Sequence, residues 1–224
     1  MSFIDCIKDR IGNNETLVKR LYSLIIFGSY VRGDFIEGVS DIDFFAVFND
    51  SAEGSIPNLI ETLEECTSSI KYKLIDLPCA NISDIREPLK QINSLKFLTF
   101  YQDDFLRYHK VVYGEDISDI LPSYDKKTLL NSRAEQLIRA PQRFKGDLKL
   151  LLLSAGETVR FEAIINGSNS ISKGDIMKTL KTIGDQEALD IYSAYIEGKE
   201  IEFSKEYLSS FIVSRISNFL ENRS

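Results

Sequence analysis

Asp41 and Asp43 flank Ile42 at the start of an apolar segment, residues 42–48, that has the pattern of a buried strand. Because side chains alternate along a strand, both carboxylates are expected on one face and Ile42 on the other. Two adjacent carboxylates on an apolar strand repel each other and resist burial. Mg²⁺ relieves that conflict, since it binds through one or two carboxylates together with substrate phosphates. The spacing therefore predicts a metal site at Asp41 and Asp43.

A glycine–serine pair precedes these acids and is suited to hold phosphate. The apolar run 24–27 predicts a short buried strand that stops at Gly28. A glycine lets the backbone approach an anion closely, and exposed N–H groups with the Ser29 hydroxyl can donate to phosphate oxygens. Arg32, in the next turn, could pair with phosphate through its planar guanidinium. We therefore expect Gly28, Ser29 and Arg32 to bind phosphate groups.

Together, Gly28-Ser29, an eleven-residue interval and Ser40-Asp41-Ile42-Asp43 resemble the signature of the DNA-polymerase-β-like nucleotidyltransferases. The resemblance is strong over residues 22–50 and weaker as far as Gly114, and aminoglycoside adenylyltransferases have the closest layout. It implies a mixed sheet flanked by helices, two Mg²⁺ ions at the aspartates, and the β- and γ-phosphates of the nucleotide at the glycine–serine pair. The implied reaction moves a nucleoside monophosphate, AMP from ATP being favoured over another NTP, to an acceptor hydroxyl.

The same resemblance implies a third carboxylate on the next central strand, as metal ligand or base. In the segment 70–77, which we expect to be a strand, Asp76 is the only acid. Aligned by its end, the segment resembles a family pattern in which the acid stands at Lys73. Positions three apart face opposite sides of a strand, so either Asp76 completes the site or Lys73 has replaced the acid. We favour Asp76; with Lys73, metal binding would weaken and the protein would bind nucleotide without turnover.

Residues 148–173 resemble the helical domain of the streptomycin-type aminoglycoside adenylyltransferases. In that family a lysine near Lys173 reaches the nucleotide triphosphate, and Ser172 is a sound N-cap for a helix end that favours anions. Glu157 and Glu162 lie on one predicted helix, and either could bind a cationic acceptor or act as general base. Five positions is not a same-face spacing, so at most one faces the site, and we favour Glu157.

The elements that position these residues change in character along the chain. Before residue 120, helical segments are expected at 1–20, 56–67 and 95–110, and strands at 24–27, 42–48, 70–77 and 111–114. Beyond Pro122 only helical periodicity occurs, in residues 129–140, 148–165, 173–183, 186–195 and 204–221. The pattern predicts an α/β (α+β) fold: a nucleotidyltransferase domain over 1–120 with a mixed sheet, then a helical bundle over 121–224, with the active site in the cleft between them.

Composition excludes several other classes of protein. The 224 residues are 43% hydrophobic and carry a net charge of −7, which argues against duplex DNA as ligand and permits a cationic small molecule. No stretch approaches the ~20 apolar residues that a membrane span needs. The odd count of cysteines, Cys6, Cys66 and Cys79, without a C-x-x-C pair, argues against a disulfide framework; we expect three small buried hydrophobes and a cytoplasmic location. A single histidine, His109, rules out a histidine-rich zinc site.

We therefore expect an enzyme, a Mg²⁺-dependent nucleotidyltransferase whose acceptor is a small molecule such as an aminoglycoside. A protein hydroxyl, as in antitoxin-type protein adenylyltransferases, is the second choice and RNA the third. The rival interpretation is a catalytically degenerate nucleotide-binding module, and the position of Asp76 distinguishes the two.

Overall fold

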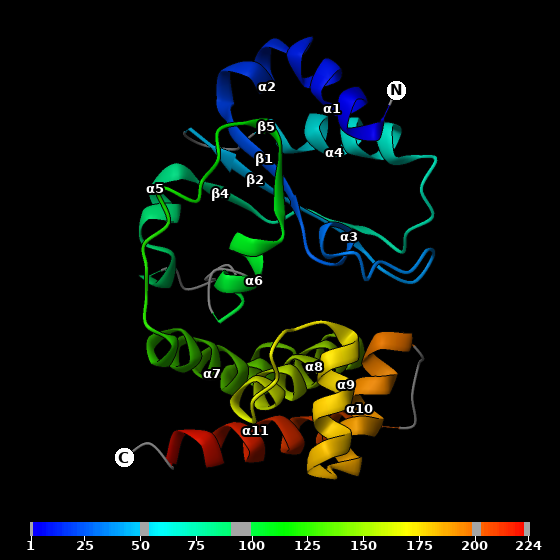
Figure 1. Ribbon diagram of the computed structural model, residues 1–224, viewed down its shortest axis with the longest axis vertical. Coiled ribbons are helices and arrows are strands. Elements are labelled where there is room, and N and C mark those ends of the chain that lie inside the picture. Colours follow the sequence, from blue (N-terminus) through cyan, green and yellow to red (C-terminus); the bar gives the residue numbers. More distant parts are fainter. Residues whose placement is uncertain (1, 50–53, 91–99, 199–202, 222–224) are drawn as a thin grey trace. The chain divides into compact units, whose positions relative to one another are not determined.

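The computed structural model describes residues 2–49, 54–90, 100–198 and 203–221 and divides into two compact units, Met1–Ser123 and Tyr124–Ser224 (Figure 1). The first unit combines a sheet with helices, and the second is built from helices, which confirms the predicted fold class. Within the described ranges, no helix is long and apolar enough to span a lipid bilayer.

A mixed sheet forms the centre of the first unit. Its order is β3-β2-β1-β5, with β4 also paired to β2. β1 runs antiparallel to β2 and β5, whereas β2 runs parallel to β3 and β4. Both central strands are buried over most of their length, as expected for continuous apolar runs covered on two faces. The strands are β1 (Leu21–Phe27), β2 (Ile42–Phe48), β3 (Ile75–Asp76), β4 (Cys79–Asn81) and β5 (His109–Gly114).

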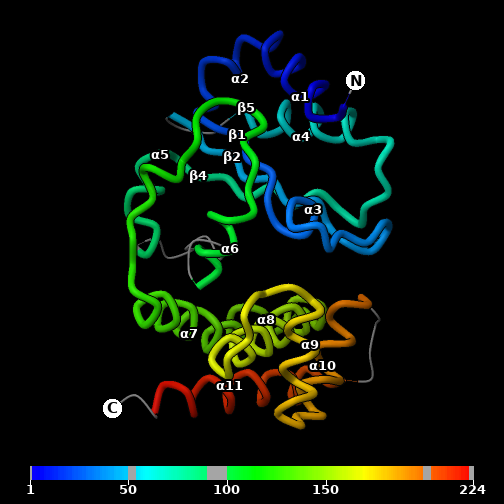
Figure 2. Tube along the Cα trace, viewed as in Figure 1, coloured from blue at the N-terminus to red at the C-terminus, as the bar shows by residue number. Residues whose placement is uncertain are grey.

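Two helices cover one face of this sheet. Alternate residues of β1 and β2, such as Ile26 and Phe44, share a core with Ile11 of α1 and Leu63 of α4. The α1 and α4 helices pack side by side (Figure 2). The predicted helix over 56–67 is confirmed as α4. The helices of this unit are α1 (Phe3–Gly12), α2 (Glu15–Arg20), α3 (Ser29–Arg32), α4 (Ile56–Thr67), α5 (Ile82–Arg86) and α6 (Gln102–Arg107), with a 3-10 turn at Pro88–Lys90.

A disulfide joins α1 to α4, which contradicts the expectation from the cysteine count. Cys6 and Cys66 are linked with their Cα atoms 5.7 Å apart, and only Cys79 is a free thiol. An odd count without a C-x-x-C pair excludes a compact disulfide framework, but it does not exclude one long-range pair brought together by helix packing. The cytoplasmic location predicted from reduced cysteines loses that support.

Two predicted elements in the first unit are wrong in extent. The predicted strand 70–77 is reduced to the two residues of β3. The backbone before β3 forms hydrogen bonds with the turn at residues 38–40 instead of with a strand: Gly38 N–H donates to Lys71 O, and Lys73 N–H donates to Ser40 O. The predicted helix 95–110 is helical only in the six residues of α6, and residues 95–99 lie outside the described residues. Its end belongs to β5, which begins at His109.

The second unit consists of helices whose predicted positions are confirmed to within a few residues. A glycine lies inside its long helix α8, where Gly156 meets the ring of Tyr195 from α10. A Cβ at position 156 would overlap that ring, so the glycine provides the space for close packing of the two helices. The helices are α7 (Lys126–Arg143), α8 (Leu148–Ile165), α9 (Lys173–Ile183), α10 (Gln186–Glu197) and α11 (Lys205–Glu221).

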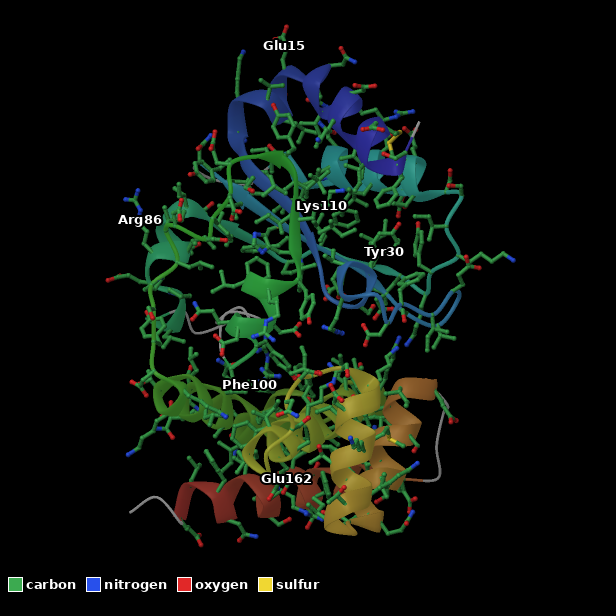
Figure 3. The ribbon with its side chains drawn as sticks, in the orientation of Figure 1. Glu15, Tyr30, Arg86, Phe100, Lys110 and Glu162 are labelled. Carbon is green, nitrogen blue, oxygen red and sulfur yellow. A yellow bond between two sulfur atoms is a disulfide. The ribbon has the colours of Figure 1, made fainter. Side chains whose placement is uncertain are left out.

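Glu162, on α8, lies in a group of charges within the second unit (Figure 3). Arg215 of α11 contacts Glu162 at 3.5 Å and bonds Asp185 and Glu187 at 2.6 and 2.8 Å. Burial raises the pKa of the Glu162 carboxyl to about 7, although the charge of Arg215 acts in the opposite direction. Its Oε2 atom is buried without a hydrogen-bond partner, which is consistent with a carboxyl that holds its proton near neutral pH.

Replacement of Gly156 by alanine is expected to lower the free energy of unfolding of the helical unit by about 1–3 kcal/mol, because the methyl group must displace the Tyr195 ring. Gly174→Ala in α9 is the matched control, since no atom lies within 4 Å of a Cβ there. Alanine should stabilise that position by up to about 1 kcal/mol. Urea unfolding followed by circular dichroism measures both; equal gains in the two variants would contradict this packing.

Stability should fall as pH rises through the titration of Glu162. Its pKa is raised in the folded state, so the native protein binds the proton more tightly than the unfolded chain does. The contribution of Glu162 is therefore most favourable below pH about 4.5 and is lost as pH approaches about 7, a difference of roughly 1–3 kcal/mol. Glu162→Gln should remove this slope from urea midpoints measured between pH 5 and 8, whereas Glu206→Gln, an exposed control, should keep it. Parallel curves for wild type and Glu162→Gln would refute the assignment.

Candidate active site

The glycine–serine turn follows directly from the end of β1. Gly28 has φ of +72° and caps α3, whose first residue is the buried Ser29. A Cβ at position 28 would collide with the Asp43 carboxylate, so a residue with a side chain cannot take this place without moving the aspartate. Both the backbone angle and the space therefore require glycine. The structure brings Gly28, Ser29 and Asp43 together, as a phosphate and metal site would need.

The register of the sheet sets two of the three predicted aspartates beside each other. Phe27 of β1 pairs with Asp43 of β2, and Asp43 pairs with Asp76 of β3. Directly paired residues on neighbouring strands point to the same face, and neighbouring strands are about 4.8 Å apart. Ile42 packs into the core on the opposite face, as the alternation predicted. The half-buried Asp41 lies two residues before Asp43, at the entrance to β2.

Asp76 and Lys73 occupy different environments. Asp76 is an exposed residue of β3 and is paired with Asp43. Lys73 lies in a bend before the strand, where its backbone N–H donates to Ser40 O at 3.1 Å. Phe27, Asp43 and Asp76 are paired in turn on three neighbouring strands, so they form one row across the sheet. Among the described residues, however, no three Asp, Glu, His or Cys side chains converge as a preformed metal site.

Arg32 has carboxylate partners close by. The guanidinium donates to both oxygens of Asp34, at 3.0 and 3.3 Å, and to Asp104 of α6 at 2.8 Å. It is only 10% exposed. The sequence did not single out either aspartate. Asp34 could have been recognised from its closeness to Arg32 in the chain, but Asp104 is 72 residues away and no local pattern indicates it.

The two predicted residues of the second unit lie on α8 and α9. Glu157 is 4% exposed, and its carboxylate contacts Arg133 at 3.3 Å and Arg160 at 3.1 Å. Tyr195 also donates to it at 3.1 Å. Such partners are what a buried carboxylate requires, and no local pattern indicates Arg133 or Tyr195, which belong to α7 and α10. Lys173 is the first residue of α9, after the N-cap Ser172, whose hydroxyl accepts from the backbone of Asp175. The acceptor role of Glu157 and the phosphate role of Lys173 stay predictions.

Comparison with known proteins indicates which kind of domain contains these residues. Residues 11–101, which include the glycine–serine turn and the three aspartates, match the family described as nucleotidyltransferase domain. The fold is similar to that of spectinomycin adenyltransferase AAD(9) from Enterococcus faecialis, a crystal structure with ATP and spectinomycin. The TM-score is 0.61 at 17% identity, covering 95% of this chain and 96% of that one. No curated protein matches by sequence. Over residues 11–101 the chain therefore matches a nucleotidyltransferase domain, and its fold is similar to that of an adenyltransferase.

Proposed function

We propose that the chain transfers AMP from ATP to a hydroxyl group of a cationic small molecule such as an aminoglycoside, in a Mg²⁺-dependent reaction. One observation carries the proposal: the Gly28 turn lies against the carboxylate of Asp43, which is in register with Asp76. A triphosphate held by the turn would therefore have its negative charge beside these acids, and such a pair of anions needs a cation between them.

The residues present fit Mg²⁺. Asp41 and Asp43 are half-buried at the start of a strand that is otherwise apolar, and the Asp43 carboxylate can lie this close to the turn only because residue 28 lacks a Cβ. Magnesium binds through few carboxylates and takes its remaining oxygens from phosphates and water, so a preformed group of three acids is not required. We assign Asp41, Asp43 and Asp76 as the ligands of two ions. When bound, the ions supply electrostatic stabilisation to the attacking and leaving oxygens.

The other residues hold and orient the nucleotide. The backbone N–H groups of the turn and the Ser29 hydroxyl are assigned to the β- and γ-phosphates. Because β1 is paired on both sides, the turn at its end has little freedom to move, and preorganised donors of this kind stabilise developing charge. By the family resemblance, Lys173 is assigned to the triphosphate. Glu157, the acid that we favour on α8, is assigned to the acceptor.

In the proposed reaction one bond forms, one bond breaks, and a residue of the chain accepts the proton. The acceptor oxygen forms a bond to the α-phosphorus, the bond from that phosphorus to the bridging oxygen breaks, and pyrophosphate leaves. The proton of the acceptor hydroxyl passes to a carboxylate, and Asp76 is the assigned base because it is exposed and adjacent to Asp43. The net charge of −7 favours a cationic acceptor, and the structurally similar AAD(9) was crystallised with ATP and spectinomycin.

Transfer of label from α-labelled ATP tests the proposal, with panels of aminoglycosides, proteins and RNA as acceptors. Label should appear on an aminoglycoside, and EDTA should abolish it. Asp41→Asn and Asp43→Asn should each lower the rate by about 100-fold or more, since each removes a metal ligand. Asp76→Asn should have a comparable effect. Retention of full activity in Asp76→Asn would show that it is not the third carboxylate.

The molecule that becomes labelled decides which acceptor is assigned to the enzyme. Label on a protein or on RNA would replace the small-molecule acceptor while keeping the chemistry. Label on no acceptor, with nucleotide binding unchanged in Asp41→Asn and Asp43→Asn, would identify a nucleotide-binding module and end the enzymatic proposal.

Gly28→Ala is expected to reduce both nucleotide binding and transfer by about 100-fold, because the new methyl group displaces the Asp43 carboxylate. Gly38→Ala is a closely matched control: its φ is also +72°, but no atom lies within 4 Å of a Cβ there. Both substitutions place alanine at the same positive φ, so a larger loss in Gly28→Ala than in Gly38→Ala reports the contact with Asp43. Isothermal titration with ATP and the transfer assay measure it; similar losses in both variants would argue against that contact.

A further inference from the structure

Arg32 is placed to hold the glycine–serine turn in shape. It is the last residue of α3, one helical turn after Ser29. The backbone N–H groups of Gly33 and Asp34 both donate to Ser29 O, at 3.0 and 3.1 Å. The Asp34 carboxylate then accepts from Arg32, so the pair closes a compact loop around Ser29.

Helix α6 contacts both ends of this turn through two consecutive residues. Asp104 bonds Arg32, which follows the turn, at 2.8 Å. Phe105 packs edge-on against Phe27, which precedes Gly28, with ring centroids 5.5 Å apart. Arg32 and Asp104 are 10% and 12% exposed, so their pair is shielded from solvent and is stronger than a surface ion pair. The position of the turn therefore depends on α6 as well as on β1.

The local charge does not suit a phosphate ligand at Arg32. Two carboxylates face one guanidinium, so the group as a whole repels an anion. A phosphate oxygen would compete with Asp104 and Asp34, which already accept from three of the five guanidinium N–H groups. We infer that Arg32 is a positioning residue which, through Asp34 and Asp104, fixes the phosphate-binding turn, and that it does not bind phosphate itself. This inference rests on the proposed function and replaces the phosphate role predicted for Arg32 from the sequence.

The test compares Asp104→Asn and Arg32→Lys in the full chain with Asp103→Asn as matched control. Asp103 is the exposed neighbour of Asp104 on α6, so its replacement removes the same charge from the same helix. Two readouts are needed: the kcat and the KM for ATP in the transfer assay, and hydrogen exchange of the Gly33 and Asp34 amides. The exchange readout reports the shape of the turn whether or not transfer occurs.

Both site variants are expected to lower kcat by about tenfold with the KM for ATP within about twofold of wild type. The kcat of the double variant should be no lower than that of the less active single variant, because the two residues act as one unit. Amide exchange at Gly33 and Asp34 should be faster in both variants. Asp103→Asn should match wild type in every readout.

A phosphate-ligand role predicts different results. Asp104→Asn would then free the guanidinium for phosphate and lower the KM for ATP with kcat retained, whereas Arg32→Lys would raise the KM alone. Either result, or unchanged amide exchange in Asp104→Asn, overturns the inference. If wild type transfers label to no acceptor, the proposed function fails, and amide exchange still decides whether Arg32 and Asp104 fix the turn.

Discussion

The close approach of the Gly28 backbone to the Asp43 carboxylate is the constraint on which the site depends. It arises from the antiparallel pairing of β1 and β2, which sets Phe27 opposite Asp43 and so directs the chain past that aspartate as the strand ends. Neither the sequence spacing nor the turn alone produces this contact. Apolar residues on the other face of both strands fix the register, because a shift of one residue would turn the carboxylates into the core.

Much of this arrangement could be predicted because it is encoded locally. The apolar run of β2 with its two acids and the helical periodicity of α4, α8 and α9 are readable from neighbouring residues, and the structure confirms those elements. The register that sets Asp76 beside Asp43 could not be derived, because it depends on where a two-residue strand docks. The rest of the predicted strand failed for a related reason: its backbone groups bond the turn at residues 38–40 instead of a ladder.

Contacts between distant parts of the chain were invisible in the sequence. The partner that α6 supplies to Arg32 is 72 residues away, and two of the partners of Glu157, Arg133 and Tyr195, come from other helices. An isolated arginine after a glycine–serine pair reads as a phosphate ligand, because only the folded chain shows the carboxylates around it. Glu162 is a second example of a property that only the folded chain shows. Its pKa is raised because the side chain is buried, and its residue type alone does not indicate this.

The Cys6–Cys66 bond has a consequence for how the first unit is connected. The covalent ring that it closes contains β1, the glycine–serine turn and β2, so the turn and the first two aspartates belong to one crosslinked loop. Closing a ring of this length restricts the unfolded chain far more than the folded one. Oxidation of the two thiols would therefore limit how far β1 and β2 can separate, whereas β3, β5 and α6 lie outside the ring and depend on noncovalent packing alone.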